Sequence, residues 1–458
     1  MKTKHILSYS FLALALTLSS CGKKLDLAPH SEIPTDEALE TANDVNNAVV
    51  GAYTIIARGS LYGTNLVMVP EIYASPGYVQ WTGSFGTFRQ IASQNIISTN
   101  ADVARTWTDA YRAINACNTV IEALGVVSDP TQKSIINGKA LFVRGIMYFE
   151  LVRLYGLPYE AGGANSTPSV PIFLKSVKNF PDLQYGATRS SVADVYKQAE
   201  NDLTAAIGML GDSPADLYAA KGMLARLYLQ QQDYGKALTQ ANDVISSGDY
   251  TLTDNLEAPF RVKNSSEGVF EIRQNEQSNA GTSNDGLTTF FASYVNNTGG
   301  LVGRGDLNIQ DAFYETYDPA DKRRTEMIYD GNGAKSGWFT KKWYGYFDNI
   351  PIVRLTELYL TRAECNVRLN SSVGAAPLDD INLLRKRAGL DDLAAVTLED
   401  VLQERTFELA FEGYRLHDLK RTKRNIGTLP YNSPKLVYPV PYGERSVNPE
   451  LGQNEGYN

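Results

Sequence analysis

One stretch of this 458-residue chain, residues 222–245, limits its fold more than any other feature. It matches a tetratricopeptide unit, in which a large residue, a small residue and a tyrosine occupy the first helix, and small residues let the second helix approach it. The matching positions are Leu224, Ala225, Tyr228, Ala237 and Ala241, with a weaker echo at Gly145 and Tyr148. Because one helix pair cannot bury its own apolar faces, we expect several pairs to stack.

Apolar residues at helical spacing recur along much of the chain. They predict helices over residues 35–56, 103–124, 131–155, 191–210, 214–247, 355–369, 379–388 and 398–421. Residues 60–100 and 250–350 lack this period and are rich in Gly, Ser, Asn and aromatic residues, so we interpret both as long loops. The Pro- and Asn-rich residues 436–458 should lie as an extended tail on the body.

The N-terminus has the pattern of a bacterial lipoprotein signal. Lys2 and Lys4 precede an apolar run, residues 11–18, that is too short to span a bilayer, and the sequence LSSC ends at Cys21. We predict that residues 1–20 are removed, that the thiol of Cys21 carries the lipid anchor, and that residues 21–34 form a tether. Such an anchor would hold an otherwise soluble chain on a membrane.

The composition argues against several classes of protein. Removing residues 1–20 takes away two lysines and no acids, so the formal charge changes from −8 to −10. An acidic chain is a poor match for nucleic acid, which needs clustered Lys and Arg. Only His30 and His417 remain after cleavage, and Cys117 and Cys365 are the remaining cysteines. We therefore expect no cofactor, no metal site and no catalytic triad, and we interpret both cysteines as buried thiols, although a disulfide between them stays open.

Several segments of this chain follow one another in the order that is characteristic of a known protein family. The resemblance covers essentially the entire mature chain. The first of these segments has Trp107, Tyr111, Ile114 and Asn118 in the pattern W-x3-Y-x2-I-x3-N. The later segments are KALFVRGIMYFELVRLYG, EGVFEIRQ, PIVRLTELYLTRAEC, INLLRKRAGL, LEDVLQERTFELAFEGYRLHDLKR and YPVPYGERSVNPELGQNEGY. Together they resemble the SusD/RagB family of outer-membrane nutrient-binding lipoproteins.

The resemblance implies a mainly α fold. About four tetratricopeptide-like helix pairs would form a right-handed superhelical scaffold, and long irregular loops would carry the ligand face. We expect a single domain over residues 35–458, with N-terminal helix pairs at 35–250, a loop-rich ligand region at 251–350, and C-terminal helices with the tail at 351–458.

The resemblance also implies a function. Such a protein is not an enzyme; it faces the cell exterior at the outer membrane, binds oligosaccharides, and delivers them to a TonB-dependent transporter. Three alternatives stay open: a peptide-binding member of the same family, a tetratricopeptide scaffold that binds only proteins, and a surface glycosidase. The scaffold alternative predicts buried loop tryptophans.

Aromatic residues in the two loop segments are the candidate ligand contacts, because sugars offer apolar faces on which rings stack. Each ring could instead hold its loop on the helical body, and Asn296 could belong to a turn. The candidates are Tyr78, Trp81, Phe85, Asn296, Trp338, Trp343 and Tyr344.

The acidic run in residues 404–421 is assigned to ion pairing. Glu404, Glu408 and Glu412 stand four residues apart, so one helix would place them on one face, near Arg405 and Arg415. Ion pairs with those two arginines explain the run better than acid–base catalysis beside His417.

Overall fold

The computed structural model describes residues 39–177 and 186–457. The predicted signal peptide, the anchor Cys21 and the tether lie outside the described residues. The assignment of residues 35–458 to one domain stays a prediction.

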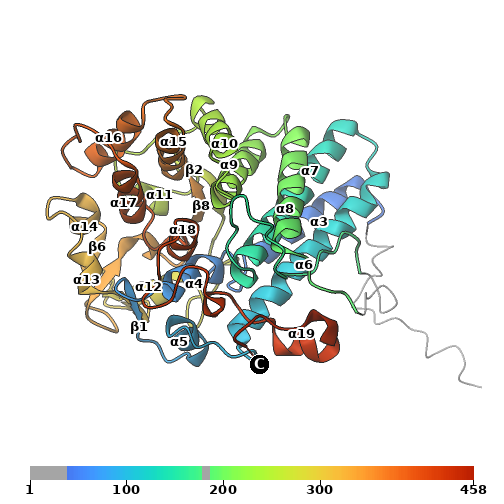
Figure 1. Cartoon of the computed structure of the whole chain (residues 1–458), viewed down its shortest axis with the longest axis horizontal. Coiled ribbons are helices and arrows are strands. Elements are labelled where there is room, and N and C mark those ends of the chain that lie inside the picture. Colours follow the sequence, from blue (N-terminus) through green and yellow to red (C-terminus); the bar gives the residue numbers. More distant parts are fainter. Residues whose placement is uncertain (1–38, 178–185, 458) are drawn as a thin grey trace, which may run out of the picture.

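Long helices stack one after another across the molecule (Figure 1). Each packs against the next in chain order, which in the described residues gives the four pairs α3/α6, α7/α8, α9/α10 and α15/α16. This arrangement confirms the mainly α, tetratricopeptide-like fold. The bounds are α3 (Ala42–Ile56), α6 (Ala101–Ala123), α7 (Pro130–Tyr155), α8 (Val192–Met209), α9 (Pro214–Gln230), α10 (Tyr234–Ser246), α15 (Leu355–Leu369) and α16 (Pro377–Arg387).

Local sequence explains the helix ends and the close packing. The side chain of Asn100 caps α6 by accepting from the backbone N–H groups of Asp102 and Val103. Gly145 on α7 lies so close to α8 that an added Cβ would meet Leu203 at 3.1 Å. The positions that matched a tetratricopeptide unit, Leu224, Ala225, Tyr228, Ala237 and Ala241, are all buried.

Residues 60–100 are more regular than the predicted loop. They contain α4 (Asn65–Tyr73), β1 (Val79–Trp81) and α5 (Gly86–Ala92). Every residue of α4 is buried, so the helix has no polar face to give the sequence a helical period. The prediction of one long loop is therefore wrong for this segment.

Residues 250–350 are loop-rich, as predicted, and are held by small sheets. Strand β2 (Gly268–Ile272) pairs with β8 (Ile350–Arg354), and β3 (Tyr294–Val295) pairs with β4 (Leu301–Val302). A four-stranded sheet has the order β1-β5-β7-β6, with β5 (Leu307–Ile309), β6 (Ile328–Asp330) and β7 (Trp338–Thr340). The short helices here are α11 (Ala258–Arg261), α12 (Leu287–Phe291), α13 (Asp311–Tyr314), α14 (Lys322–Thr325) and η3 (Lys341–Trp343).

The helix predicted over residues 398–421 is broken into α17 (Leu398–Glu408) and α18 (Arg415–Arg421). Phe411 and Gly413 have positive φ angles of 70° and 89° in the break. The buried carboxylate of Glu71 accepts the backbone N–H groups of Phe411, Gly413 and Arg415 at 3.1, 2.7 and 3.3 Å. The freed backbone donors thus find their acceptor on α4, far away in the sequence.

The three glutamates of the acidic run form ion pairs, but not with the expected arginines; Arg405 pairs instead with Asp418, at 2.8 Å. Glu404 pairs with Arg323 at 2.5 Å, and Glu412 pairs with Arg354 at 2.8 Å. Glu408 also pairs with Arg354, at 3.4 Å. Arg323 and Arg354, the partner arginines in these ion pairs, lie on α14 and β8. The break removes Glu412 from the face of α17.

The C-terminal tail lies on the body, as predicted. The Tyr438 N–H donates to the carbonyl of Leu154 at 2.7 Å, and the Tyr73 hydroxyl contacts the carbonyl of Val437 at 3.0 Å. The tail includes η4 (Pro434–Leu436), α19 (Tyr442–Val447) and η5 (Pro449–Leu451). Cys117 and Cys365 are buried and unbonded, so no disulfide joins them.

Candidate functional site

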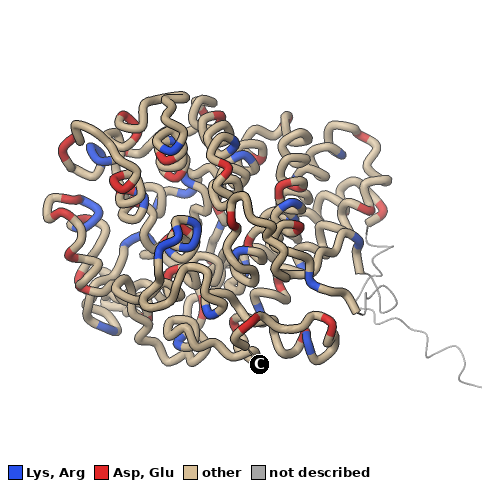
Figure 2. Tube along the Cα trace, in the orientation of Figure 1, with Lys and Arg blue, Asp and Glu red and all other residues tan. Residues whose placement is uncertain are grey.

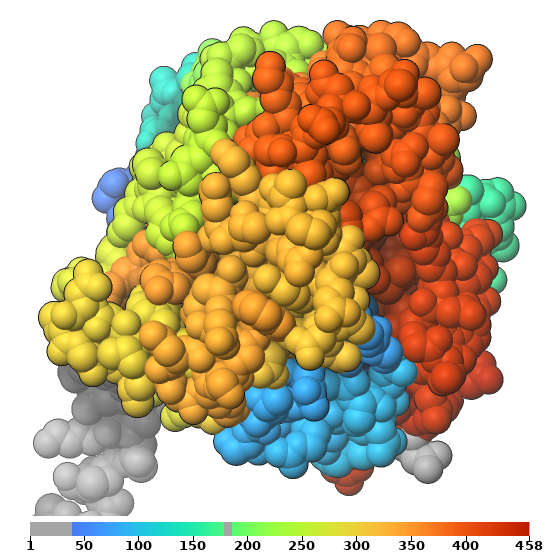
Figure 3. Space-filling view, turned by 90° about the vertical axis from the view of Figure 1, so that its left-hand side faces the viewer, coloured from blue at the N-terminus to red at the C-terminus, as the bar shows by residue number. Residues whose placement is uncertain are grey.

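Strand β5 joins the two aromatic segments that the sequence singles out. Trp81 of β1 lies opposite Leu307 of β5, and Ile309 of β5 lies opposite Trp338 of β7. One small sheet therefore carries both segments. In Figure 3 the loop-rich residues, yellow to orange, cover a large part of the face, with the blue N-terminal segment below them.

Tyr78 lies inside the protein and is only 1% exposed. Its ring stacks on Phe411 with centroids 5.4 Å apart, and its hydroxyl donates to Glu71. Burial raises the pKa of Glu71 above its ordinary value, against the opposing hydrogen bond from Tyr78. Tyr78 thus holds the break between α17 and α18, and its ring has no accessible face for a ligand.

Trp81 packs its segment onto the body in a similar way. It is 8% exposed and lies between Phe88 and Phe290, with centroid distances of 5.0 and 5.7 Å. Phe85 is half-buried beside the same cluster, and the guanidinium of Arg304 lies 4.9 Å from its ring centroid. Of these two predicted contacts, only Phe85 has substantial accessible surface.

Trp338 is half-buried and stacks on Tyr314 with centroids 4.0 Å apart and planes 11° apart. Its indole N–H donates to the carboxylate of Asp311 at 2.9 Å, at an exposed position. The Arg324 guanidinium lies 4.5 Å from the Tyr314 ring centroid. Tyr314 and Asp311 were not predicted as contacts, because nothing in the pattern of residues 311–314 shows that β7 will lie beside them.

Tyr344 forms a second stacked pair with Tyr294, with centroids 3.7 Å apart and planes nearly parallel. Both rings are half-buried. Burial raises the pKa of Tyr294 to about 12, so its hydroxyl stays protonated and donates to the Tyr344 carbonyl at 3.0 Å. Arg261 lies 5.4 Å from the Tyr344 ring centroid.

Trp343 and Asn296 have structural partners of their own. Trp343 is 4% exposed, and its indole N–H donates to the Phe411 carbonyl at 2.7 Å. Asn296 is exposed in the turn between β3 and β4, where its side-chain oxygen accepts the N–H groups of Thr298 and Gly300. Trp343 therefore has no free ring face, and the oxygen of Asn296 is occupied by the turn.

The two stacked pairs flank the β6–β7 hairpin. Trp338 and Phe339 are neighbours on a strand and project to opposite faces. Phe339 packs against Tyr329, whose ring also contacts Tyr344. The candidate contacts therefore divide between two places, with Trp338 on one side of the hairpin and Tyr344 on the other.

A polar bridge closes the edge of the sheet near Trp81. The ammonium of Lys335 donates to Thr82 at 3.1 Å and pairs with Asp306 at 2.8 Å. Arg304 also pairs with Asp306, at 2.9 Å, and donates to Ser84 at 3.0 Å. These charged groups form a rim that periodicity did not predict.

Neither a metal cluster nor a membrane-spanning helix is present in the part of the chain that the structure describes. No three His, Cys, Asp or Glu side chains gather there as metal ligands. No helix within that part is long and apolar enough to cross a bilayer.

Comparison with known proteins agrees with this architecture. Residues 23–229 match a SusD-like family model described as "Starch-binding associating with outer membrane", and residues 337–432 match the SusD family model. The first description is of a binding protein rather than of an enzyme. SusD-like protein P25 of Formosa agariphila is 24% identical over 100% of this chain and 99% of its own length.

Solved structures show the same fold. A SusD superfamily protein from Bacteroides thetaiotaomicron has a TM-score of 0.80 at 24% identity and covers 90% of this chain and 99% of its own. Surface glycan-binding protein A from the same species has a TM-score of 0.72 at 21% identity and covers 91% of this chain and 100% of its own. With both family models matched in order and a relative aligned end to end, this chain belongs to the SusD/RagB family.

Proposed function

We propose that this protein binds oligosaccharides at the outer membrane, with the half-buried aromatic rings of residues 251–350, together with Phe85, as its contact surface. The family description names starch binding and the outer membrane, and one structural relative is named a glycan-binding protein. A sugar ring stacks on an aromatic face and forms hydrogen bonds at its rim. The Trp338–Tyr314 pair with the Asp311 carboxylate beside it has this combination.

The observation that carries the proposal is the accessibility of Trp338. Among the four tryptophans of the chain, Trp81, Trp107 and Trp343 are less than a tenth exposed, whereas Trp338 is half-buried. Tyr344 and Phe85 stay in the proposed surface as secondary contacts. The proposed surface no longer includes Tyr78, Trp81 and Trp343, because their rings are buried.

Two carboxylates from the aromatic segments, Glu71 and Asp348, are engaged within the protein. Glu71 is buried under Tyr78, and Asp348 pairs with Arg261 at 2.6 Å. A glycosidase needs two carboxylates placed across a sugar bond with one free to donate a proton. Glu71 and Asp348 are both engaged by protein groups, so these two carboxylates are poorly suited to that role.

The test is a fluorescence titration of the full chain in a polyoxyethylene detergent, which carries no sugar head group. The panel begins with maltooligosaccharides, because the matched family model is described as starch-binding. We expect saturable quenching that disappears in W338F and persists in the control W107F, whose tryptophan is buried. If no oligosaccharide quenches the fluorescence, the protein would instead bind peptides or act as a protein-binding scaffold. The burial of Trp81 and Trp343 would fit the scaffold.

We further propose a lipid anchor at Cys21, exposure to the cell exterior and delivery to a TonB-dependent transporter. The LSSC motif and the family resemblance support all three. C21A should release the protein from membranes, and protease added to intact cells should cleave the wild type. A TonB-dependent transporter should copurify with the wild-type protein; its absence after mild extraction would remove the delivery step and leave sugar binding intact.

A further inference from the structure

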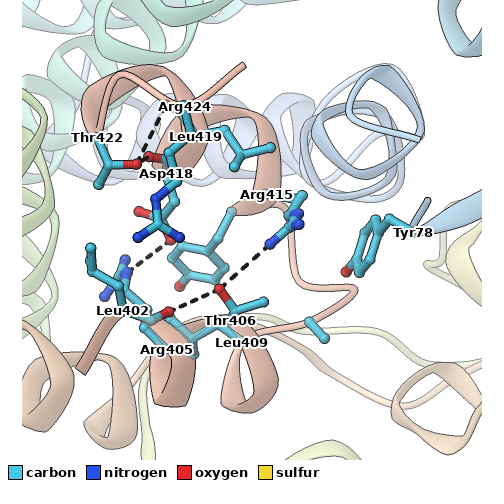
Figure 4. Close-up of a pocket in the computed structure, with 12 residues that line it drawn as sticks. Tyr78, Leu402, Arg405, Thr406, Leu409, Arg415, Asp418, Leu419, Thr422 and Arg424 are labelled. Atoms are coloured by element: carbon cyan, nitrogen blue, oxygen red, sulfur yellow. Dashed lines mark hydrogen bonds and ion pairs between the residues drawn. The ribbon is translucent and has the colours of Figure 1, made fainter. Parts of the chain in front are cut away.

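A small cavity of about 30 Å³ lies between α17 and α18, with Tyr78 at one side (Figure 4). This is room for about two water molecules. Arginines dominate its charged lining: Arg405 from α17, Arg415 from α18, and Arg424 just beyond α18, with Asp418 as the single acid. Figure 2 shows Lys and Arg residues gathered at α18.

Arg405 carries hydrogen-bond donors that the protein leaves without an acceptor. Its side chain is 1% exposed, and its Nε donates to Asp418 at 2.8 Å. Both terminal nitrogens are buried without a hydrogen-bond partner, and the nearest acid beyond Asp418, Glu357, stands 3.8 Å away. The oxygens of Glu357 already accept from Arg226 at 2.8 and 2.7 Å. Buried donors of this kind normally find an acceptor.

Arg415 is a second cation with spare donors. No acid among the described residues lies within ion-pairing distance of it, and its buried Nε has no partner. Within residues 39–177 and 186–457, its only side-chain hydrogen bond is a long one of 3.5 Å to the Thr406 hydroxyl. Figure 4 shows Arg415 extending from the α18 side toward Thr406 on α17.

The acids around the cavity do not balance its arginines. Burial alone would raise the pKa of Asp418, but Arg405 and Arg421 lower it, so the group stays ionised. Its charge is shared between those two guanidinium groups, at 2.8 and 2.7 Å. Arg424 pairs outward with the exposed Glu399. The cavity therefore keeps an excess of positive charge and of unused N–H donors.

We propose that this cavity binds a carboxylate group. A carboxylate is planar and offers two acceptor oxygens, which match the donor fork of a guanidinium. Its two oxygens fit a cavity that has room for about two water molecules. A larger molecule would insert its carboxylate between Arg405 and Arg415 and leave the remainder at the mouth, beside Thr406 and Arg424. The carboxylate could come from a free organic acid or from an acidic sugar.

The test is calorimetric titration of the full chain with acetate, glucuronate and glucose at constant ionic strength in chloride. We expect acetate and glucuronate each to give a heat of binding. Glucose should give no heat that depends on Arg415. R415Q should weaken acetate binding by at least about tenfold, since a hydrogen bond between charged groups is lost. The control R112Q alters an exposed arginine on α6 and should bind as the wild type does.

The outcomes separate the sources of the carboxylate and separate this site from the proposed sugar surface. Equal binding of acetate and glucuronate supports a site for free carboxylates, and much tighter binding of glucuronate supports one for acidic sugars. W338F should leave acetate binding unchanged, because Trp338 does not line the cavity. The proposal is overturned if neither anion binds, or if R415Q, with an unchanged melting temperature, binds acetate as tightly as the wild type.

Discussion

Glu408 shows how a single buried carboxylate ties the loop-rich segment to the helices. It accepts ion pairs from Arg387 at 2.8 Å and from Arg323 and Arg354, both at 3.4 Å. Burial alone would raise its pKa, but these arginines and Lys342 lower it from 4.5 to about 2. Removing one partner of such a network leaves buried charge uncompensated.

The lowered pKa of Glu408 therefore predicts part of the loss of folding stability at low pH. A carboxyl whose pKa is lowered by folding contributes stability above its unfolded pKa, near 4.5, and loses it as the pH falls toward 2. The lowered pKa corresponds to about 3 kcal/mol. Denaturant titrations at pH 5 and pH 2.5 should show a smaller loss of unfolding free energy in E408Q than in the wild type.

E326Q is the matched control, because Glu326 is exposed and its nearest cation, Lys322, is 3.9 Å away. It should keep the wild-type pH dependence. If E408Q and the wild type lose the same free energy between the two pH values, the assigned role of Glu408 is wrong.

The exposure and the contacts of individual side chains were the hardest features to predict from the sequence. The aromatic content of both segments was plain in the sequence, but whether a ring is accessible depends on partners that lie far away along the chain. Tyr78 stacks on Phe411, and the Trp343 N–H donates to that residue's carbonyl. Trp338 keeps accessible surface because its stacking partner, Tyr314, belongs to the short surface helix α13.

At the scale of elements, the break between α17 and α18 is the clearest departure from the sequence pattern. The helical period continues through residues 398–421, so local sequence predicts one helix. The break depends on Glu71 and on the backbone freedom of Gly413, whose φ is 89°. Residues in this region of φ other than glycine are strained.

We expect G413A to lower the unfolding free energy by about 2 kcal/mol, from backbone strain plus close contact. An added Cβ would lie 3.0 Å from the Leu66 carbonyl oxygen and from Val67 Cα, both backbone atoms of α4. Equilibrium denaturation measures the change. The control is G443A in α19, where an added Cβ meets nothing within 4 Å. Equal stability of the two variants would contradict this account of the break.

At the scale of the whole molecule, the helical stack was predictable and the loop face was not. The stacked helices follow one another in the chain, so local periodicity and the tetratricopeptide pattern were enough to predict them. The sheet β1-β5-β7-β6 pairs strands from distant segments, and its strands have only three residues each. Such short strands give almost no periodic signal, so the polar rim of Lys335 and Arg304 and the pairing of Trp338 with Tyr314 emerged only in three dimensions.

The central claim is that the accessible aromatic surface around Trp338 binds sugar. Calorimetric titration of W338A with the oligosaccharide that quenches wild-type fluorescence tests it most directly. We expect W338A to bind this sugar at least about tenfold more weakly at an unchanged melting temperature, because the loss of a stacked aromatic anchor removes a main binding contact. Y442A, which removes a 54% exposed ring in α19, should bind as the wild type does. Wild-type affinity in W338A would contradict the account.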